Sequence, residues 1–184
     1  MSVPLSDLQR LYAETDDPWD FDTSAYEQEK FAATAAALSR DRYRAGFEIG
    51  CGNGALARHI APRCDGYVGM DAVERAVEAA RARVPDARFI QALYPCPLPE
   101  DDFDLILLSE FLYFLGADTI RDLAVDLERR WPDAELILVT YLGDTAHTLQ
   151  GEDALAIFTE AATGHDIQPV RRTEGYRIDR GLPR

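Results

Sequence analysis

The chain has 184 residues, a length typical of one domain, and its 47% of hydrophobic residues are enough to build a core. Its net charge of −14 argues against a nucleic-acid partner, because an acidic chain repels phosphate backbones. The start of the sequence does not resemble a secretory signal, and no apolar stretch approaches the roughly 20 residues that span a membrane, so we expect a cytoplasmic protein without a membrane partner. The three cysteines and three histidines lack metal-ligand spacing, so we expect reduced cysteines and no bound metal.

Two helices are predicted before the first strand. Residues 5–13 carry leucines on one side, and residues 24–38 begin with a Ser-x-x-Glu capping box. The polar loop between them, residues 16–23, carries Trp19 and Phe21. This loop is either a surface segment pinned to the core by its two aromatic rings or a segment that also covers a ligand.

From residue 45 onward, apolar strands alternate with helices. Strands are predicted over residues 45–50, 66–71, 87–93, 103–110 and 134–141, helices over 55–61 (ending at Pro62), 72–84, 118–131 and 152–163, and a closing strand pair over 166–181. The pattern predicts an α/β fold: a Rossmann-like, doubly wound, mostly parallel seven-stranded sheet with an antiparallel edge strand. Ligands of such sheets bind beyond the carboxyl ends of the strands.

The stretch FEIGCGNGAL holds Gly50, Gly52 and Gly54 where the first strand gives way to a helix. Each glycine inside an element costs about 0.5–1 kcal/mol relative to alanine, so three of them indicate a tight turn or a ligand close to the backbone. Glu48 precedes them inside an apolar strand. Asp71 ends the second strand, where an acid can hold both hydroxyls of an adenosine ribose.

A dinucleotide-binding oxidoreductase is the natural alternative. Its fingerprint is GxGxxG, whereas the spacing here is GxGxG, followed by Ala55. Glu48 would repel a pyrophosphate and attract a cation. A ligand with an adenosine, no phosphate and a positive charge fits better, and S-adenosylmethionine is such a ligand.

These motifs, together with GYVGMDAVERAVEAAR, FDLILLSEFLYFL and AELILVTY, resemble those of class I methyltransferases that depend on S-adenosylmethionine. The stretches DPWDFDTSAYEQEKFAATAAAL and SEFLYFL resemble the NodS-like family, named for a nodulation methyltransferase that N-methylates the free amine of a deacetylated chitooligosaccharide. The resemblance implies one methyltransferase domain over residues 1–184, with an N-terminal helical lid (1–40) and a Rossmann-like core (45–184).

The resemblance also implies roles for residues around the cofactor. The three glycines would pass under its methionyl part and ribose, Glu48 would face its amine, and Asp71 would hold the ribose. Ala72 would lie against the adenine. Leu93 stands where an acid often contacts the adenine amine, so the backbone N–H groups of Leu93 and Tyr94 are the candidates for that contact.

The resemblance places further residues near the reacting methyl group. Trp19, Tyr26 and Lys30 would close over the cofactor, with Lys30 as a candidate partner for its carboxylate. Ser109 and Glu110 end the fourth strand beside the position of methyl transfer.

Methyl transfer from a sulfonium needs alignment and exclusion of water, and an attacking amine must be neutral. Glu110, Tyr113 and His147 are the candidates for orienting or deprotonating it. The alternative explanations are a capping or cofactor-side role for Glu110, core packing for Tyr113 and a loop position for His147. We therefore predict a methyltransferase for a small molecule, with an amino sugar or another amine as the favoured acceptor. An O-methyltransferase and a non-catalytic S-adenosylmethionine-binding protein are the alternatives, and the oligomeric state stays open.

Overall fold

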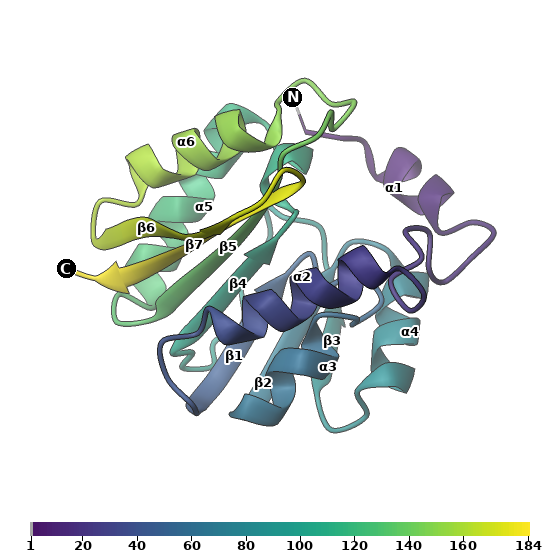
Figure 1. Ribbon diagram of the computed structural model, residues 1–184, viewed down its shortest axis with the longest axis horizontal. Helices are drawn as coiled ribbons and strands as arrows, with labels where there is room; N and C mark the ends of the chain where they lie inside the picture. The colour runs from purple at the N-terminus through teal and green to yellow at the C-terminus, as the bar shows by residue number, and fades with distance from the viewer. Residues whose placement is uncertain (1) are drawn as a thin grey trace.

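Seven strands form one sheet in the computed structural model, which describes residues 2–184 (Figure 1). They are β1 (Tyr43–Ile49), β2 (Cys64–Asp71), β3 (Arg88–Gln91), β4 (Leu105–Ser109), β5 (Glu135–Tyr141), β6 (His165–Arg172) and β7 (Tyr176–Pro183). Their order is β3-β2-β1-β4-β5-β7-β6. The first five run parallel, and the antiparallel pairing is confined to β7 and its neighbours at the β6 edge. The predicted seven-stranded, mostly parallel sheet is confirmed.

The helices cover both faces of this sheet. They are α1 (Leu5–Leu11), α2 (Ala25–Ala36), α3 (Ala57–Ile60), α4 (Glu74–Arg83), α5 (Ala117–Arg130) and α6 (Gly151–Ala161), with 3-10 turns η1 (Ala61–Arg63) and η2 (Leu112–Phe114). Figure 1 shows α5 and α6 on one face and α2, α3 and α4 on the other. No helix within residues 2–184 combines the length and apolar character needed to cross a bilayer.

Alternate residues of the central strands feed two separate cores. In β4, Ile106 and Leu108 pack with α5 and α6, while Leu105 and Leu107 pack with α2, α3 and α4. All four side chains are buried, and each such burial stabilises the fold by about 1.5–3 kcal/mol. A strand buried on both faces reads as a continuous apolar run, which is why the sequence predicted it.

Two local features differ from the prediction. The helix expected from residue 55 until Pro62 is shorter: α3 covers only Ala57–Ile60, and the chain continues as the 3-10 turn that contains Pro62. The capping box of α2 is only half formed. The hydroxyl of Ser24 accepts from the backbone N–H of Glu27 at 3.3 Å, but the Glu27 side chain turns to Lys30 instead.

The strand order reverses between β1 and β4, which are neighbours in the sheet. Their register pairs Ile49 with Leu108, so the loops that follow the two strands begin side by side. Ligand sites of doubly wound sheets lie at such a point. In Figure 1 α1 and the loop after it lie on the side toward which the parallel strands point.

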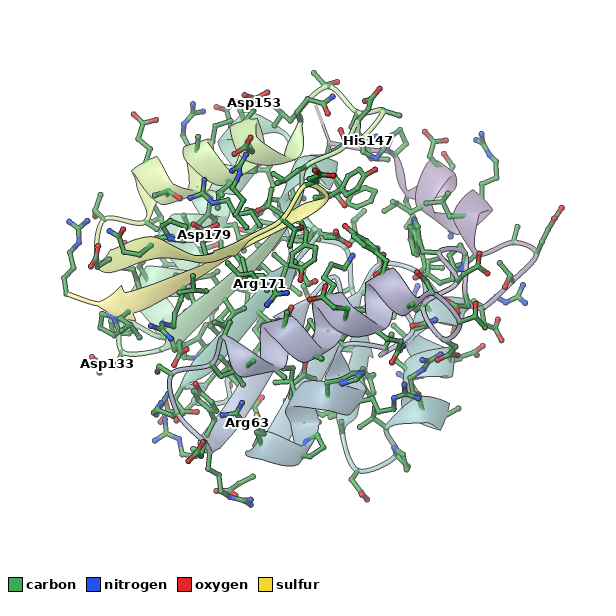
Figure 2. All side chains as sticks on the ribbon, in the orientation of Figure 1. Arg63, Asp133, His147, Asp153, Arg171 and Asp179 are labelled. Carbon is green, nitrogen blue, oxygen red and sulfur yellow. The ribbon has the colours of Figure 1, made fainter. Side chains whose placement is uncertain are left out.

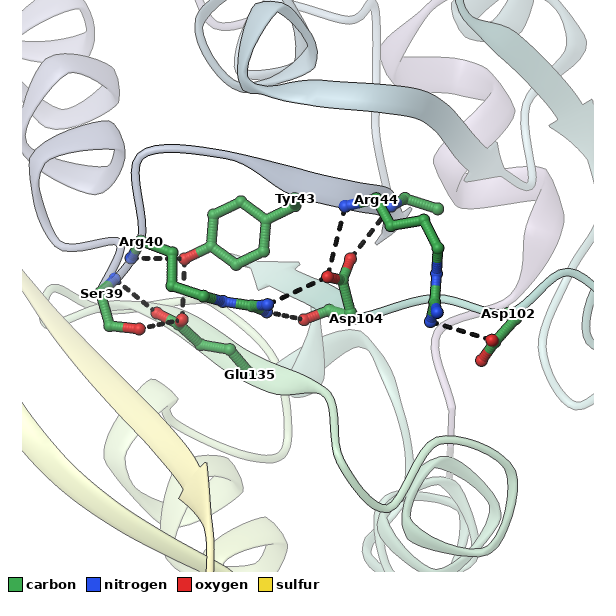
Figure 3. A network of polar contacts seen from close by, with 8 residues as sticks. Ser39, Arg40, Tyr43, Arg44, Asp102, Asp104 and Glu135 are labelled. Atoms are coloured by element: carbon green, nitrogen blue, oxygen red, sulfur yellow. Dashed lines mark hydrogen bonds and ion pairs between the residues drawn. The ribbon is translucent and has the colours of Figure 1, made fainter.

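A polar network holds the opposite, amino ends of β1, β4 and β5 together (Figure 3). The buried carboxylate of Glu135 accepts hydrogen bonds from Ser39 and Tyr43, at 2.5 and 2.7 Å for their hydroxyls. Arg40 donates to the Asp104 carboxylate at 3.0 Å. This network anchors the chain between α2 and β1 far from the carboxyl ends.

The closing hairpin holds α2 against the sheet. Figure 2 shows Arg171 directed from β6 toward α2, where it pairs with Glu29. The hydroxyl of Tyr176 donates to the same carboxylate at 2.7 Å, and the ring of Tyr26 meets Tyr176 edge-on at 5.9 Å. These contacts fix α2 on the side that faces the β6–β7 hairpin.

The predicted division into an N-terminal lid (1–40) and a core (45–184) stays a prediction.

Candidate functional site

A cavity of about 800 Å³ opens at the carboxyl ends of β1, β2 and β4. This volume is within the range of small-molecule sites. The N-terminal segment, η2 and the loop after β5 complete its walls. Of the predicted site residues, those that line it are Trp19, Tyr26, Glu48, Gly50, Gly52, Asp71, Ala72, Leu93, Tyr94, Ser109, Glu110, Tyr113 and His147. Gly54 and Lys30 do not line it.

The glycines of the loop after β1 have positive φ angles and different neighbours. Gly52, with φ +52°, lines the cavity, and a Cβ there would lie 3.1 Å from the hydroxyl of Tyr12. A Cβ at Gly54 would instead press against the backbone of Ala80 in α4 at 3.0 Å. Gly52 thus keeps the cavity surface open, while Gly54 lets the loop pack on its neighbouring helix.

Asp71 joins the end of β2 to the glycine loop. Its two carboxylate oxygens accept from the backbone N–H groups of Gly52 and Val73, each at 2.9 Å. Burial raises the pKa of Asp71, and these hydrogen bonds oppose the rise. Each oxygen has a second lone pair, so the side chain can still accept from ligand hydroxyls, although the predicted ribose contact stays a prediction.

Glu48 is a buried acid at the floor of the cavity. It is 1% exposed and accepts a hydrogen bond from the Tyr67 hydroxyl at 2.7 Å. Burial raises the pKa of Glu48 to about 8, and the Tyr67 bond opposes the rise only in part. In the protein without ligand, burial therefore favours the neutral acid at neutral pH. Its predicted contact with the cofactor's amine stays a prediction.

The N-terminal segment brings a residue into the site that the sequence did not predict. Tyr12, at the end of α1, lines the cavity and meets the ring of Trp19 edge-on at 5.6 Å. Trp19 also stacks on Phe21 at 5.5 Å and keeps 41% of its surface exposed. In the sequence, Tyr12 is marked only by its place near the apolar side of a short helix. That place is explained by core packing as well as by a position in the cavity wall.

The loop over residues 16–22 is tied to the glycine loop through Asn53. Its side-chain amide donates to the backbone carbonyl of Asp16 at 3.0 Å and to the carboxylate of Asp17 at 3.2 Å. Asp22 adds an ion pair with Arg83 of α4 at 2.6 Å. The same loop that carries Trp19 is thereby coupled to the backbone on which a ligand would rest.

Glu110 stands at the end of β4 in an unusual conformation. Its φ is +50°, which a side chain other than glycine rarely adopts, and its N–H donates to the carbonyl of Val139 at 2.8 Å. Lys30 donates to its carboxylate at 2.6 Å and pairs with Glu27 at 2.8 Å. Burial raises the pKa of Glu110, and the Lys30 ammonium opposes the rise.

Lys30 was predicted to contact the carboxylate of the cofactor, and that contact stays a prediction. Its side chain is 2% exposed, and its ammonium already has two carboxylate partners, Glu27 and Glu110. The observed ion pairs favour a role in orienting these acids. Glu27 was recognised in the sequence only as a capping residue.

Tyr113 and His147 meet at the same wall of the cavity. Their rings stack with centroids 6.1 Å apart, and His147 also contacts Phe114 at 4.9 Å. Figure 2 shows His147 on the loop between β5 and α6. Burial and the charge of Glu110 raise the pKa of Tyr113, so its phenol remains a donor at neutral pH. The structure thus brings all three predicted acceptor-side residues together, without testing their roles.

Among residues 2–184, the Asp, Glu, Lys and Arg side chains that line the cavity are all acids. They are Glu27, Glu48, Asp71, Glu110 and Asp144. Within residues 2–184 no lysine or arginine lines it. Such a cavity concentrates cationic ligands and disfavours phosphates.

Comparisons with known proteins match most of the chain. The family of nodulation protein S (NodS) matches residues 4–129. Nodulation protein S of Bradyrhizobium diazoefficiens is 32% identical over 168 residues, which cover 84% of this chain and 78% of that protein. The protein of the same name from Sinorhizobium fredii is 32% identical over 104 residues, 54% of this chain and 48% of that one, so this alignment spans about half of that relative.

A solved structure extends the match to nearly the whole fold. The N-methyltransferase NodS from Bradyrhizobium japonicum WM9, in complex with S-adenosyl-L-homocysteine, superposes with a TM-score of 0.82 at 23% identity, covering 97% of this chain and 98% of that one. The family match includes the N-terminal segment, the glycine loop and the end of β4, which together build the cavity. The chain therefore belongs to the NodS family.

Proposed function

We propose that this protein is an S-adenosylmethionine-dependent methyltransferase that N-methylates a small-molecule amine in the cavity beyond β1 and β4. The NodS relatives and the bound S-adenosyl-L-homocysteine of the solved N-methyltransferase support this assignment. The observation in this chain that carries it is the acid-lined cavity, with Glu110 at the end of β4.

The residues present fit the proposed cofactor. The open surface at Gly52 admits a ligand against the backbone, and Asp71 offers acceptor lone pairs beside it. Glu48 can become a carboxylate next to a cation, and the absence of lysine and arginine from the described cavity wall suits a sulfonium better than a pyrophosphate. When bound, S-adenosylmethionine supplies an electrophilic methyl group on a positively charged sulfur.

The protein's own residues align the acceptor with the methyl group, exclude water from the cavity and supply a proton acceptor. Tyr12, Trp19 and Phe21 cover one side of the cavity and exclude water from it. Glu110, with its pKa raised by burial, accepts the proton that an acceptor ammonium must lose before its nitrogen can attack. Tyr113, beside it, supplies a hydrogen-bond donor for a hydroxyl of the acceptor.

A set of related sugars tests this function. The purified protein and S-adenosylmethionine are incubated with D-glucosamine, deacetylated chitotetraose, N-acetyl-D-glucosamine or D-glucose, and released S-adenosylhomocysteine is measured by mass spectrometry. We expect release with the two free amines only. Equal release with glucose would indicate O-methylation. No release with any amine, while S-adenosylhomocysteine still raises the melting temperature, would indicate a binding protein without catalysis.

A further inference from the structure

Lys30 is the only lysine in the sequence, and it is one of the most buried side chains. Its ammonium lies 2.8 Å from a carboxylate oxygen of Glu27 and 2.6 Å from one of Glu110. Glu27 and Lys30 are one turn apart on α2, while Glu110 follows β4. A buried lysine is rarely kept unless it is paired, so this cluster is a built feature of the cavity wall.

The cluster has one positive and two negative charges. Both carboxylates line the cavity, whereas the ammonium does not. Within residues 2–184, Oε1 of Glu110 is buried and has no hydrogen-bond partner, while Oε2 of Glu27, also buried, has the Lys30 ammonium 2.8 Å away. A buried acceptor without a donor is costly, so the arrangement lacks a donor for Glu110 and one positive charge.

Tyrosine rings surround the same place. Tyr26, Tyr113 and Tyr141 all line the cavity, and the Lys30 ammonium lies 5.2 Å from the centroid of the Tyr26 ring. The charge of Glu110 is among the causes, after burial, that raise the pKa of Tyr26 to about 12. Aromatic faces beside paired carboxylates are a favourable environment for an alkylammonium group.

We propose that Glu27, Lys30 and Glu110 form the amine subsite of the acceptor, in which the two carboxylates bind the acceptor's ammonium and Lys30 is the positioning residue that holds them. The acceptor's ammonium supplies the missing donor for Glu110 and the missing positive charge. One of its protons then passes to Glu110, which leaves a neutral amine and a carboxylic acid. This inference rests on the proposed function, since it names the part of the cavity that recognises the amine.

The helix offers a matched control for Glu27. Glu29, two residues along α2, also carries a carboxylate, but it pairs with Arg171 and Tyr176 on the outward side and does not line the cavity. Glu27→Gln and Glu29→Gln therefore remove the same charge from the same helix on different sides. Only the first should affect the acceptor.

Kinetics with D-glucosamine test the carboxylate pair. We expect Glu27→Gln to raise KM for glucosamine at least tenfold while the affinity for S-adenosylhomocysteine changes less than about twofold, and Glu29→Gln to change neither. An unchanged KM in Glu27→Gln would overturn the subsite, and so would an equal loss of cofactor affinity. If the wild type methylates no amine at all, the proposed function fails with it, so the two failures are distinguishable.

Because the sequence has a single lysine, NMR can observe the Lys30 side chain directly. Protein labelled with ¹³C at lysine Cε gives one side-chain NMR signal, that of Lys30. We expect this signal to move when D-glucosamine is added to the complex with S-adenosylhomocysteine, and to stay unmoved with D-glucose. A signal that moves with S-adenosylhomocysteine, but not with 5′-methylthioadenosine and not with glucosamine, would assign Lys30 to the cofactor's carboxylate and overturn the positioning role.

Discussion

The carboxylate of Asp71 accepts a hydrogen bond from the backbone N–H of Gly52 at 2.9 Å. The acid at the end of β2 therefore fixes the glycine loop at the end of β1, in addition to facing the cavity. Because its other oxygen is held by the N–H of Val73, the carboxylate is oriented before any ligand arrives. A pre-oriented acceptor loses little entropy when a ribose binds.

Replacing Asp71 should weaken the cofactor strongly. Asp71→Ala removes the acceptors, and Asp71→Asn turns an NH₂ group toward one of two backbone donors. Hydrogen bonds to a charged group contribute about 1.5–3 kcal/mol, so we expect the Kd for S-adenosylhomocysteine to rise at least tenfold in both variants. Calorimetry on folded protein measures this, and an unchanged Kd would move the ribose contact elsewhere.

Gly52→Ala should lower both stability and cofactor affinity. A Cβ at φ +52° is strained by about 1–3 kcal/mol and would lie 3.1 Å from the Tyr12 hydroxyl. The larger Gly52→Val should abolish binding. Gly66→Ala is the control, because Gly66 has no positive φ and the nearest heavy atom to its added Cβ is 3.9 Å away. Thermal melts with and without S-adenosylhomocysteine compare the variants, and identical ligand-induced shifts would show that Gly52 does not face the ligand.

Glu48 should make the unliganded protein less stable as the pH rises. Its pKa is raised in the folded state, so its stabilising contribution is complete below its ordinary pKa and is lost as the pH rises toward about 8. The slope from this group is at most about 1.4 kcal/mol per pH unit.

Glu48→Gln keeps an acceptor for the Tyr67 hydroxyl and removes the titration. Urea unfolding between about pH 5 and 8 should show a shallower fall in the free energy of unfolding for the variant than for the wild type. Glu110, whose pKa is also raised, titrates in both proteins and cancels in the comparison. The charge of Asp71 contributes to the raised pKa of Glu48, so this coupling is part of the measured difference. Parallel curves would mean that Glu48 is ionised throughout this range.

The N-terminal segment should become more ordered when the cofactor binds. Trp19 is 41% exposed on a loop that Asn53 ties to the glycine loop. We expect residues 16–30 to gain hydrogen-exchange protection on binding S-adenosylhomocysteine, and the emission of Trp19 to shift. The signal of Trp131, buried with its indole N–H on the carbonyl of Asp101, should stay constant, so a Trp19→Phe protein should show no shift. An unchanged exchange pattern would identify this segment as a packed arm.

The sequence predicted the sheet well because its central strands are buried on both faces and therefore appear as continuous apolar runs, as in Leu105–Ser109. The glycines and Asp71 were found because their spacing follows from the local strand-to-helix turn. The helix before Pro62 was predicted, but the sequence did not show that α3 is limited to Ala57–Ile60 or that Pro62 lies in a following 3-10 turn.

Contacts between distant segments were not predictable from local pattern. Lys30 and Glu110 are 80 residues apart, and nothing near either residue indicates the ion pair. The sequence pattern explained Glu27 fully as a capping residue, so nothing indicated that its side chain lines the cavity and pairs with Lys30. Tyr12 lies in the site only because α1 folds back over the glycine loop, an arrangement set by tertiary packing.

The position of the transferred methyl group tests the assignment most directly. Wild-type protein is incubated with S-adenosylmethionine that carries a ¹³C-labelled methyl group and with deacetylated chitotetraose, and the purified sugar is examined by ¹³C NMR. The acidic, amine-binding cavity predicts one new N-methyl signal, and the same signal should be absent from fully acetylated chitotetraose. An O-methyl signal, or unlabelled sugar after a reaction in which the protein binds S-adenosylhomocysteine normally, would contradict N-methylation at this site.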